Sequence, residues 1–384
     1  MVGVAKKQAS RSGGPDNGAA AGAGLLARPV GEERRRGRGA LSNASGRFER
    51  LERSETDDGW GSLDALAPFK TTVVEEKPKR IITRNASPDI SFDRSINPYQ
   101  GCEHGCVYCF ARPTHAYYGL SPGLDFETKL FAKPNAAALL EKELSDPNYA
   151  PKTIAIGTNT DPYQPIERQR RIMRQILEVL DRFSHPVGIV TKSTLIVRDL
   201  DILSRMAERG LVKAAVSVTS LDHRLSRTME PRAATPQRRI ETIRLLADAG
   251  VPTSVMLAPV IPALNDAEME QILMTAASAG AREAGYILLR LPLEVRDLFV
   301  EWLQENFPDR AGKVLSILRG MRGGKDYDAT WGKRMRGSGP YAWLLGRRFE
   351  LAAKRFGLNE KKARLRTDLF TRPPQKGEQL SLFG

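Results

Sequence analysis

The three cysteines of this 384-residue chain all lie within eight residues, at Cys102, Cys106 and Cys109. Their spacing, three and then two intervening residues, lets three thiolates bend round one soft metal centre. Gly101 and Gly105 supply the backbone freedom that such a loop needs. Because the chain contains no fourth cysteine, one coordination position of such a centre has no protein thiolate.

Three alternatives arise from the same segment. Three buried structural cysteines are disfavoured, because such residues would not normally crowd so closely. A structural zinc site could recruit His104 or His115 as a further ligand, but such sites usually pair two short ligand knuckles at a distance. Disulfides are disfavoured by the odd number of cysteines and by an N-terminus that lacks the pattern of a secretory signal. The spacing therefore favours a three-thiolate metal centre over a zinc knuckle or a disulfide.

The gap pattern C-x3-C-x2-C, with Tyr108 before the last cysteine, resembles the cluster loop of the radical S-adenosylmethionine (SAM) enzymes. The resemblance covers residues 91–309. It implies that the three cysteines hold three irons of a [4Fe-4S] cluster and that SAM binds the fourth iron. It also implies that SAM is cleaved to methionine and a 5'-deoxyadenosyl radical, which abstracts hydrogen from a substrate.

From residue 91 onward, short strand patterns alternate with helical ones, which predicts an α/β fold with a parallel sheet and helices packed outside it. Residues 171–183 and 240–249 have apolar side chains at helical spacing. Six βα units in a row resemble the partial (βα)6 barrel of radical SAM enzymes, in which ligands gather at the carboxyl ends of the strands. The predicted strands are 91–96, 153–157, 187–191, 213–218, 253–257 and 286–289.

Polar residues follow several of these strands. Thr158, Asn159 and Asp161 lie in the loop after the second strand, where the radical SAM superfamily contacts the amino group of SAM. Lys192 closes the third strand, and Ser217 lies in the fourth. All five would place hydrogen-bonding groups near the barrel mouth, although turn and capping roles are equally common for most of these residue types.

Within the superfamily, the cysteine loop and these strand ends are most similar to the spore photoproduct lyase group of DNA repair photolyase relatives. The resemblance implies that Lys192 and Ser217 bind SAM and that Tyr108 packs near its adenine. Those lyases place a cysteine hydrogen donor in the loop after the second strand, where this chain reads Gly157-Thr158-Asn159. The resemblance therefore transfers the cofactor chemistry without the substrate, and it assigns no catalytic residue.

Positive charge is concentrated at the two ends of the chain, which has a net charge of +14. Residues 310–384 contain 18 Lys and Arg against 6 Asp and Glu, and the first 40 residues contain 8 against 3. A nearly neutral core with two basic extensions predicts association with nucleic acid, with a merely solvated basic surface as the alternative. Tyr327, Trp331 and Trp343 lie among the C-terminal basic residues and could stack on bases or be buried.

The composition divides the chain into five segments. Residues 1–60, rich in Gly, Ala, Ser and Arg, predict a disordered basic arm, and 61–90 form a lead-in. The barrel at 91–309 precedes a basic helical extension at 310–370 and a flexible tail at 371–384. No apolar run approaches the ~20 residues needed to cross a bilayer. We expect a cytoplasmic location, where thiolate clusters survive.

The tail carries a short motif, formed by Gln379, Leu380, Ser381, Leu382 and Phe383. It resembles the pentapeptide by which bacterial DNA polymerases and repair proteins dock on the replication sliding clamp. Leu382 and Phe383 could enter a hydrophobic groove on the clamp, while Gln379 hydrogen-bonds at its edge. A motif this short also arises by chance or docks on its own domain.

These observations together predict a radical SAM enzyme that acts on DNA or another nucleic acid, in repair or modification. Its expected cofactors are a [4Fe-4S] cluster and SAM, with an external electron donor. The alternative is a non-catalytic adaptor that binds zinc or an iron–sulfur cluster and is recruited to nucleic acid and the sliding clamp.

Overall fold

A seven-stranded sheet forms the centre of the structure, a computed structural model that describes residues 4–6, 29–49, 51–53 and 67–373. Its order is β12-β11-β10-β9-β8-β5-β4, so the six parallel strands follow one another in chain order and β4 pairs antiparallel at one edge. All six predicted strands are present; the strand at 187–191 has the predicted ends, and the ends of the other five are shifted. The strands are β4 (Thr83–Arg84), β5 (Arg94–Ile96), β8 (Ile154–Ile156), β9 (Val187–Thr191), β10 (Val212–Ser217), β11 (Thr253–Val260) and β12 (Glu283–Leu288).

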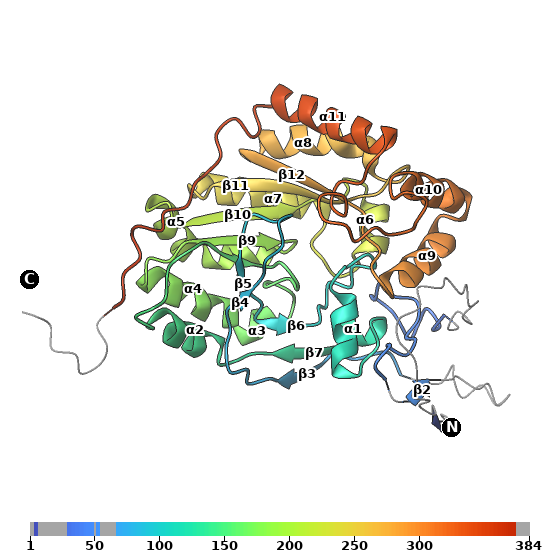
Figure 1. Cartoon of the computed structure of the whole chain (residues 1–384), viewed down its shortest axis with the longest axis horizontal. Coiled ribbons are helices and arrows are strands. Elements are labelled where there is room, and N and C mark those ends of the chain that lie inside the picture. The colour runs from blue at the N-terminus through green and yellow to red at the C-terminus, as the bar shows by residue number, and fades with distance from the viewer. Residues whose placement is uncertain (1–3, 7–28, 50, 54–66, 374–384) are drawn as a thin grey trace, which may run out of the picture.

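Helices cover the outer face of this sheet, as the resemblance implied (Figure 1). α4 (Ile172–Arg182) and α7 (Pro236–Asp248) form at the two predicted helical segments. In the described residues β12 and β4 do not pair, so the sheet is an open, partial (βα)6 barrel. The other helices within residues 133–307 are α2 (Ala136–Leu144), α3 (Glu167–Arg170), η2 (Thr194–Asp199), α5 (Leu200–Glu208), α6 (His223–Met229), η3 (Asp266–Glu268), α8 (Met269–Ser278) and α9 (Val295–Asn306).

A second, three-stranded sheet carries the segment with the cysteines. β6 (Tyr99–Gln100) ends just before Cys102, and it pairs antiparallel with β7 (Lys129–Ala132). β3 (Thr72–Glu75) adds parallel to the other side of β7. Between β6 and β7 run the cysteine loop and two short helices, η1 (Arg112–Tyr118) and α1 (Leu124–Thr128).

Residues 29–49 pack against the cysteine-bearing segment, which corrects the predicted disordered arm for the part of residues 1–60 that is described with its side chains. Val30, Ala40 and Leu41 are buried, and Val30 N–H donates to the Leu41 carbonyl at 2.8 Å. The averaged composition hid these few apolar residues, because charged and small residues separate and surround them. Elsewhere in this region, β1 (Val4–Lys6) pairs antiparallel with β2 (Leu51–Arg53).

The C-terminal extension folds onto the far edge of the barrel. α10 (Pro308–Gly320) follows α9, and α11 (Pro340–Arg355) lies along α8 with Leu345 and Phe349 buried (Figure 1). The chain then returns across the outer layer, where Thr371 N–H donates to the Phe183 carbonyl at 3.1 Å. The clamp-like motif lies outside the described residues. In the described part of the chain, every helix is too short or too polar to cross a membrane.

Candidate cofactor site

The cysteine loop turns sharply at its two glycines. Gly101 and Gly105 have φ angles of 76° and 67°, in the left-handed region that favours glycine. A Cβ atom at Gly105 would also lie 2.8 Å from a carboxylate oxygen of Glu127, so both conformation and space require glycine there. Tight turns follow, with Gly105 N–H donating to the Cys102 carbonyl and Cys109 N–H to that of Cys106.

The three cysteines are free thiols, two of them buried and Cys109 partly exposed. Burial raises the pKa of all three, and at Cys102 the charges of Asp161 and the other two thiolates add to the rise. Across the described residues, no group of three His, Cys, Asp or Glu side chains is arranged to hold a metal ion as it stands. Three soft donors on one short loop nevertheless fit an iron–sulfur cluster, whose binding would keep buried sulfurs as thiolates.

The two histidines of the zinc alternative contact other groups. His104 Nδ1 lies 3.4 Å from a carboxylate oxygen of Asp161, and His115 Nε2 lies 2.8 Å from the Lys129 carbonyl. Burial lowers the pKa of His115 to about 4, which favours the neutral imidazole. Because both histidines already contact other groups, the three cysteines are the metal donors that this loop supplies.

Tyr108 attaches one side of the loop to the strand ends of the barrel. Its hydroxyl donates to the buried carboxylate of Glu230, which also accepts from Thr219 Oγ1 at 2.7 Å. Lys192 Nζ lies 5.8 Å from the centre of the Tyr108 ring. Two predicted cofactor residues, Tyr108 and Lys192, therefore lie together beside the cysteine loop.

The charge of Lys192 also reaches the thiols. Burial raises the pKa of Cys106 and Cys109, and the nearby ammonium group opposes that rise. A cation close to the cysteines favours thiolates and suits the carboxylate of an amino acid.

Ser217 lies at the end of β10, and its position is tied to the same buried group. Ser217 Oγ donates weakly to the Ala258 carbonyl at 3.4 Å, and its own carbonyl accepts from Arg239 at 3.1 Å. Arg239 in turn forms a buried ion pair with Glu230. The sequence analysis missed Glu230 and Arg239, because no local pattern marks a carboxylate that meets Tyr108 across 122 positions of the chain.

Asp161 has a structural role in the loop after β8. Its carboxylate accepts hydrogen bonds from Thr191 Oγ1 and Lys192 N–H at 2.7 Å and from Tyr163 N–H at 2.9 Å, in addition to the His104 contact. Burial would raise the pKa of this carboxyl, but His104 and the hydrogen bonds from Lys192 and Thr191 lower it to about 2. Asp161 therefore connects the cysteine loop to the end of β9 and positions Lys192.

The other predicted residues of this loop are less constrained. Thr158 and Asn159 are half-buried, and Asn159 N–H donates to Asn97 Oδ1 at 3.2 Å. Gln164, which the sequence analysis missed, fixes the start of the cysteine loop. Its side chain donates to the Gly101 carbonyl at 3.1 Å and accepts from Glu103 N–H at 2.9 Å.

The opposite side of the cysteine loop is closed by a buried ion pair. Arg112 is fully buried and donates to the Cys106 carbonyl at 2.9 Å and to Glu127 at 2.5 Å. Glu127 also accepts from the backbone N–H groups of Gly39 and Ala40 at 2.9 and 2.8 Å. Residues 29–49 are thereby held against the outer side of the loop.

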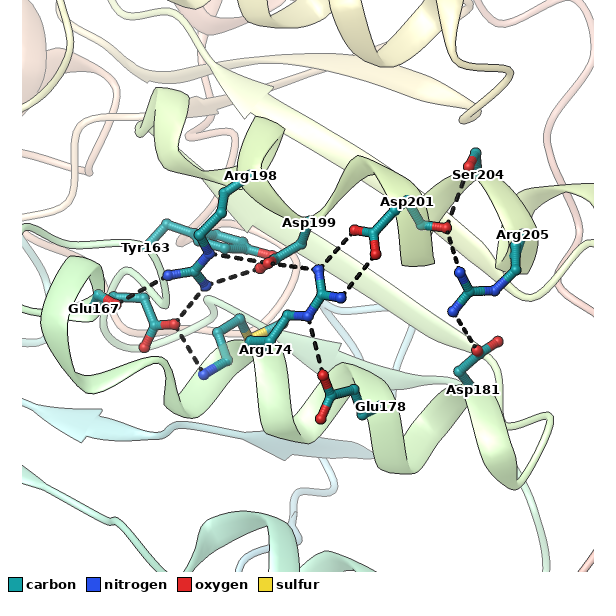
Figure 2. A network of polar contacts seen from close by, with 11 residues as sticks. Tyr163, Glu167, Arg174, Glu178, Asp181, Arg198, Asp199, Asp201, Ser204 and Arg205 are labelled. Carbon is teal, nitrogen blue, oxygen red and sulfur yellow. Dashed lines mark hydrogen bonds and ion pairs between the residues drawn. The ribbon is translucent and has the colours of Figure 1, made fainter.

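A network of charged side chains supports the loop from the helical layer (Figure 2). Arg198 contacts Glu167 at 2.8 Å and Asp199 at 2.9 Å, and both carboxylates are fully buried. Glu167 also accepts a hydrogen bond from Tyr99, two residues before Gly101. The network thus fixes the strand that leads into the cysteine loop.

Comparisons with known proteins agree with this arrangement. Residues 96–276 match the sequence model of the radical SAM superfamily. The chain is 39% identical over 232 residues to the uncharacterized protein Rv2578c of Mycobacterium tuberculosis, covering 60% of this chain and 68% of that one. It is 24% identical over 240 residues to the uncharacterized protein MJ0683 of Methanocaldococcus jannaschii, covering 62% and 85%.

Among solved structures, spore photoproduct lyase complexed with dinucleoside spore photoproduct superposes with a TM-score of 0.54. The match covers 74% of this chain and 80% of the lyase, at 15% sequence identity. A cysteine-to-serine mutant of that lyase gives a TM-score of 0.52 at 16% identity over the same shares. At such low identity these likenesses concern the fold alone.

Proposed function

This chain belongs to the radical SAM superfamily, and from that premise we propose that it is a SAM-cleaving enzyme that acts on DNA or another nucleic acid. Members of the superfamily are enzymes that use a [4Fe-4S] cluster and SAM. When bound, these groups supply an electron and a sulfonium whose cleavage yields methionine and a 5'-deoxyadenosyl radical that abstracts hydrogen.

One observation carries the proposal: three free cysteines share a single loop that Tyr108 joins to the carboxyl ends of the barrel strands. In the proposed site, Cys102, Cys106 and Cys109 hold the cluster. Lys192, beside the Tyr108 ring, would bind the carboxylate of SAM.

The remaining contacts to SAM are assigned to residues of the barrel mouth. Thr158 and Asn159 would bind its amino group, and Ser217 would offer a hydroxyl from the end of β10. Asp161 would act indirectly, because its carboxylate already holds the backbone of Lys192. Tyr108 would pack near the adenine.

Three features support a nucleic acid as the substrate. The fold resembles that of spore photoproduct lyase, described as bound to a dinucleoside spore photoproduct. Residues 310–384 carry an excess of 12 positive charges, and the side chains of Trp331 and Trp343 are 60% and 70% exposed. All three cysteines lie in the cluster loop, so a thiol hydrogen donor from elsewhere in this chain is ruled out. We therefore propose that the enzyme repairs or modifies the nucleic acid, and that the substrate radical regains hydrogen from a donor other than a further cysteine of this chain.

The test is anaerobic purification followed by SAM turnover under reduction. We expect brown protein with about four irons per chain and formation of 5'-deoxyadenosine and methionine. Turnover should rise with one of three additions: ultraviolet-damaged DNA, intact DNA or tRNA. Cys106→Ser is the matched control and should lose both iron and turnover. A colourless zinc protein without turnover would instead support the non-catalytic adaptor.

We further propose that the tail motif docks on the bacterial sliding clamp through Gln379, Leu380, Ser381, Leu382 and Phe383. Only the sequence supports this proposal. The enzyme would act in a reducing cytoplasm and receive electrons from an external donor. Removal of residues 379–384 should abolish capture by the purified clamp and leave SAM cleavage intact. Undiminished capture would reject the docking proposal without affecting the enzymatic one.

A further inference from the structure

Arg290 lies at the barrel mouth, two residues beyond the carboxyl end of β12. Its guanidinium carbon is 5.0 Å from the centre of the Phe110 ring, and Phe110 directly follows Cys109. The Phe110 side chain is 44% exposed. Arg290 therefore reaches the cysteine loop from the last parallel strand, while Lys192 approaches it from the third.

The charge of Arg290 is not balanced by a carboxylate within ion-pair distance among the described residues. Its hydrogen-bond acceptors are weak or neutral: the Tyr327 hydroxyl at 3.3 Å and the Met335 sulfur at 3.7 Å. Its Nε is buried and has no partner at all. The nearby carboxylate of Asp89 is already paired with Arg334. A planar five-donor fork with so few acceptors is suited to an oxyanion.

Residues 321–337, here called the closing segment, hold Arg290 in this place. They run beside β12, where Leu288 N–H donates to the Met335 carbonyl at 2.9 Å. They also reach the other edge of the sheet, where Gly332 N–H donates to Asp89 at 2.6 Å. The segment thus spans the two edges that the open barrel leaves unpaired, and it supplies both acceptors of Arg290.

The closing segment presents a basic and aromatic rim to solvent. Lys325, Lys333 and Arg336 are exposed, and Trp331 is 60% exposed between them in sequence. Positive side chains interleaved with an aromatic ring are typical of surfaces that bind single-stranded nucleic acid. Arg290 lies inward of this rim, between the exposed segment and the cysteine loop.

We propose that Arg290 binds a backbone phosphate of the polynucleotide substrate and so places the adjoining nucleotide at the cysteine loop. The inference rests on the proposed function and names the chemistry by which the substrate is held. SAM carries the other oxyanion of this site, a carboxylate. Lys192 lies beside Tyr108 and close to two of the cysteines, so we assign the carboxylate to Lys192 and the phosphate to Arg290.

The experiment compares Arg290→Gln, Arg290→Lys and Arg244→Gln in the full-length protein with its cluster. Arg244 is an exposed residue of α7 paired with Glu241, so its variant is the matched control for loss of one positive charge. Anisotropy of a fluorescein-labelled single-stranded DNA measures affinity at several salt concentrations, and calorimetry measures SAM binding separately. Thermal unfolding checks that each variant is folded.

We expect Arg290→Gln to weaken DNA binding about tenfold and to reduce the slope of log affinity against log salt by about one. Arg290→Lys should retain part of the DNA affinity. Arg244→Gln should bind DNA as tightly as the wild-type protein does, and the affinity for SAM should be unchanged in every variant. A methylphosphonate oligonucleotide, which has no backbone charge, should bind the wild-type protein and Arg290→Gln alike.

Two results would overturn the assignment: unchanged DNA affinity in Arg290→Gln, or a loss of SAM affinity with DNA binding intact, which would make the anion the SAM carboxylate. Neither result bears on the proposed function as such. Failure of the wild-type protein to bind any nucleic acid would be a different outcome, because it removes the proposed substrate class together with the role of Arg290.

Discussion

The arginines of the helical layer and the cations of the barrel mouth differ in how their charge is balanced. In the helical layer, Arg174, Arg198 and Arg205 each contact at least one carboxylate (Figure 2). At the mouth, Lys192 and Arg290 lie over aromatic rings, and within the described residues neither has a carboxylate at ion-pair distance. Removing one partner of a balanced buried pair destabilises a fold, whereas an unbalanced cation is available to a ligand.

The largest effect on stability should come from removing an arginine of the helical layer, where the charges are balanced. Arg198→Met removes the shared partner of Glu167 and Asp199, which are both fully buried. We expect the free energy of unfolding to fall by about 3–5 kcal/mol, because two buried charges lose their nearest cation. Urea denaturation measures the change.

The control for this prediction is Arg182→Met, which breaks an exposed pair with Glu141. That change should cost no more than about 1 kcal/mol. Equal losses in the two variants would mean that the network of Figure 2 contributes no more than an ordinary surface pair.

The second effect concerns the outer side of the cysteine loop, where the packing leaves no space. A Cβ atom at Gly39 would lie 1.8 Å from the carbonyl oxygen of Gly105, so Gly39→Ala must push residues 29–49 away from the loop. We expect a loss of about 1–3 kcal/mol in stability and faster labelling of Cys106 by a thiol reagent in cluster-free protein. Gly31→Ala is the control, because its Cβ would meet nothing within 4 Å. Identical labelling rates would show that this segment does not cover the loop.

The third effect is a dependence of stability on pH, which we attribute to His185 in the outer layer of the fold. Burial lowers the pKa of His185 to about 4, and the imidazole lies 2.8 Å from the Tyr149 hydroxyl. The unfolded chain takes up a proton near pH 6.5, so the stability that neutral His185 contributes is present above that pH and is lost as the pH falls towards 4. Between pH 7 and pH 5 the loss due to His185 alone should be about 2 kcal/mol.

Urea denaturation of cluster-free protein at the two pH values tests this expectation. His185→Leu should show a smaller loss between them, although His115, with a pKa also lowered by burial to about 4, keeps part of the dependence. Arg290→Gln should leave the pH dependence unchanged, because the barrel mouth lies apart from His185. A His185→Leu variant with the full wild-type dependence would contradict the assignment.

The sequence predicts the fold better than it predicts the side-chain pairs that complete the site. The strand at 187–191 forms as β9 with the predicted ends, because an apolar run between two helical patterns is a local signal. Cys102, Cys106 and Cys109 also lie on a single loop, as local spacing requires.

Pairs that form across the barrel leave no such signal. Tyr108 meets Glu230 only after several βα units have brought their loops together, and Gly39 meets Gly105 only when residues 29–49 fold back. Asp161, which the sequence predicts as a SAM contact, also accepts hydrogen bonds from Thr191 and Lys192, and these depend on the parallel alignment of β8 with β9. Tertiary closure, more than local propensity, therefore determines these contacts.

The smallest effect on stability should come from an arginine-to-methionine change at the barrel mouth. Arg290→Met removes a cation–π contact with Phe110 and two weak hydrogen bonds, but it also removes a buried Nε that has no partner. These contributions have opposite signs, so we expect a change within about 1 kcal/mol. Because Arg198→Met makes the same chemical change, the two variants compare a balanced and an unbalanced arginine directly under urea. A loss of stability in Arg290→Met as large as that in Arg198→Met would mean that Arg290 stabilises the fold. It would then not be an unbalanced cation that is available to an anionic ligand.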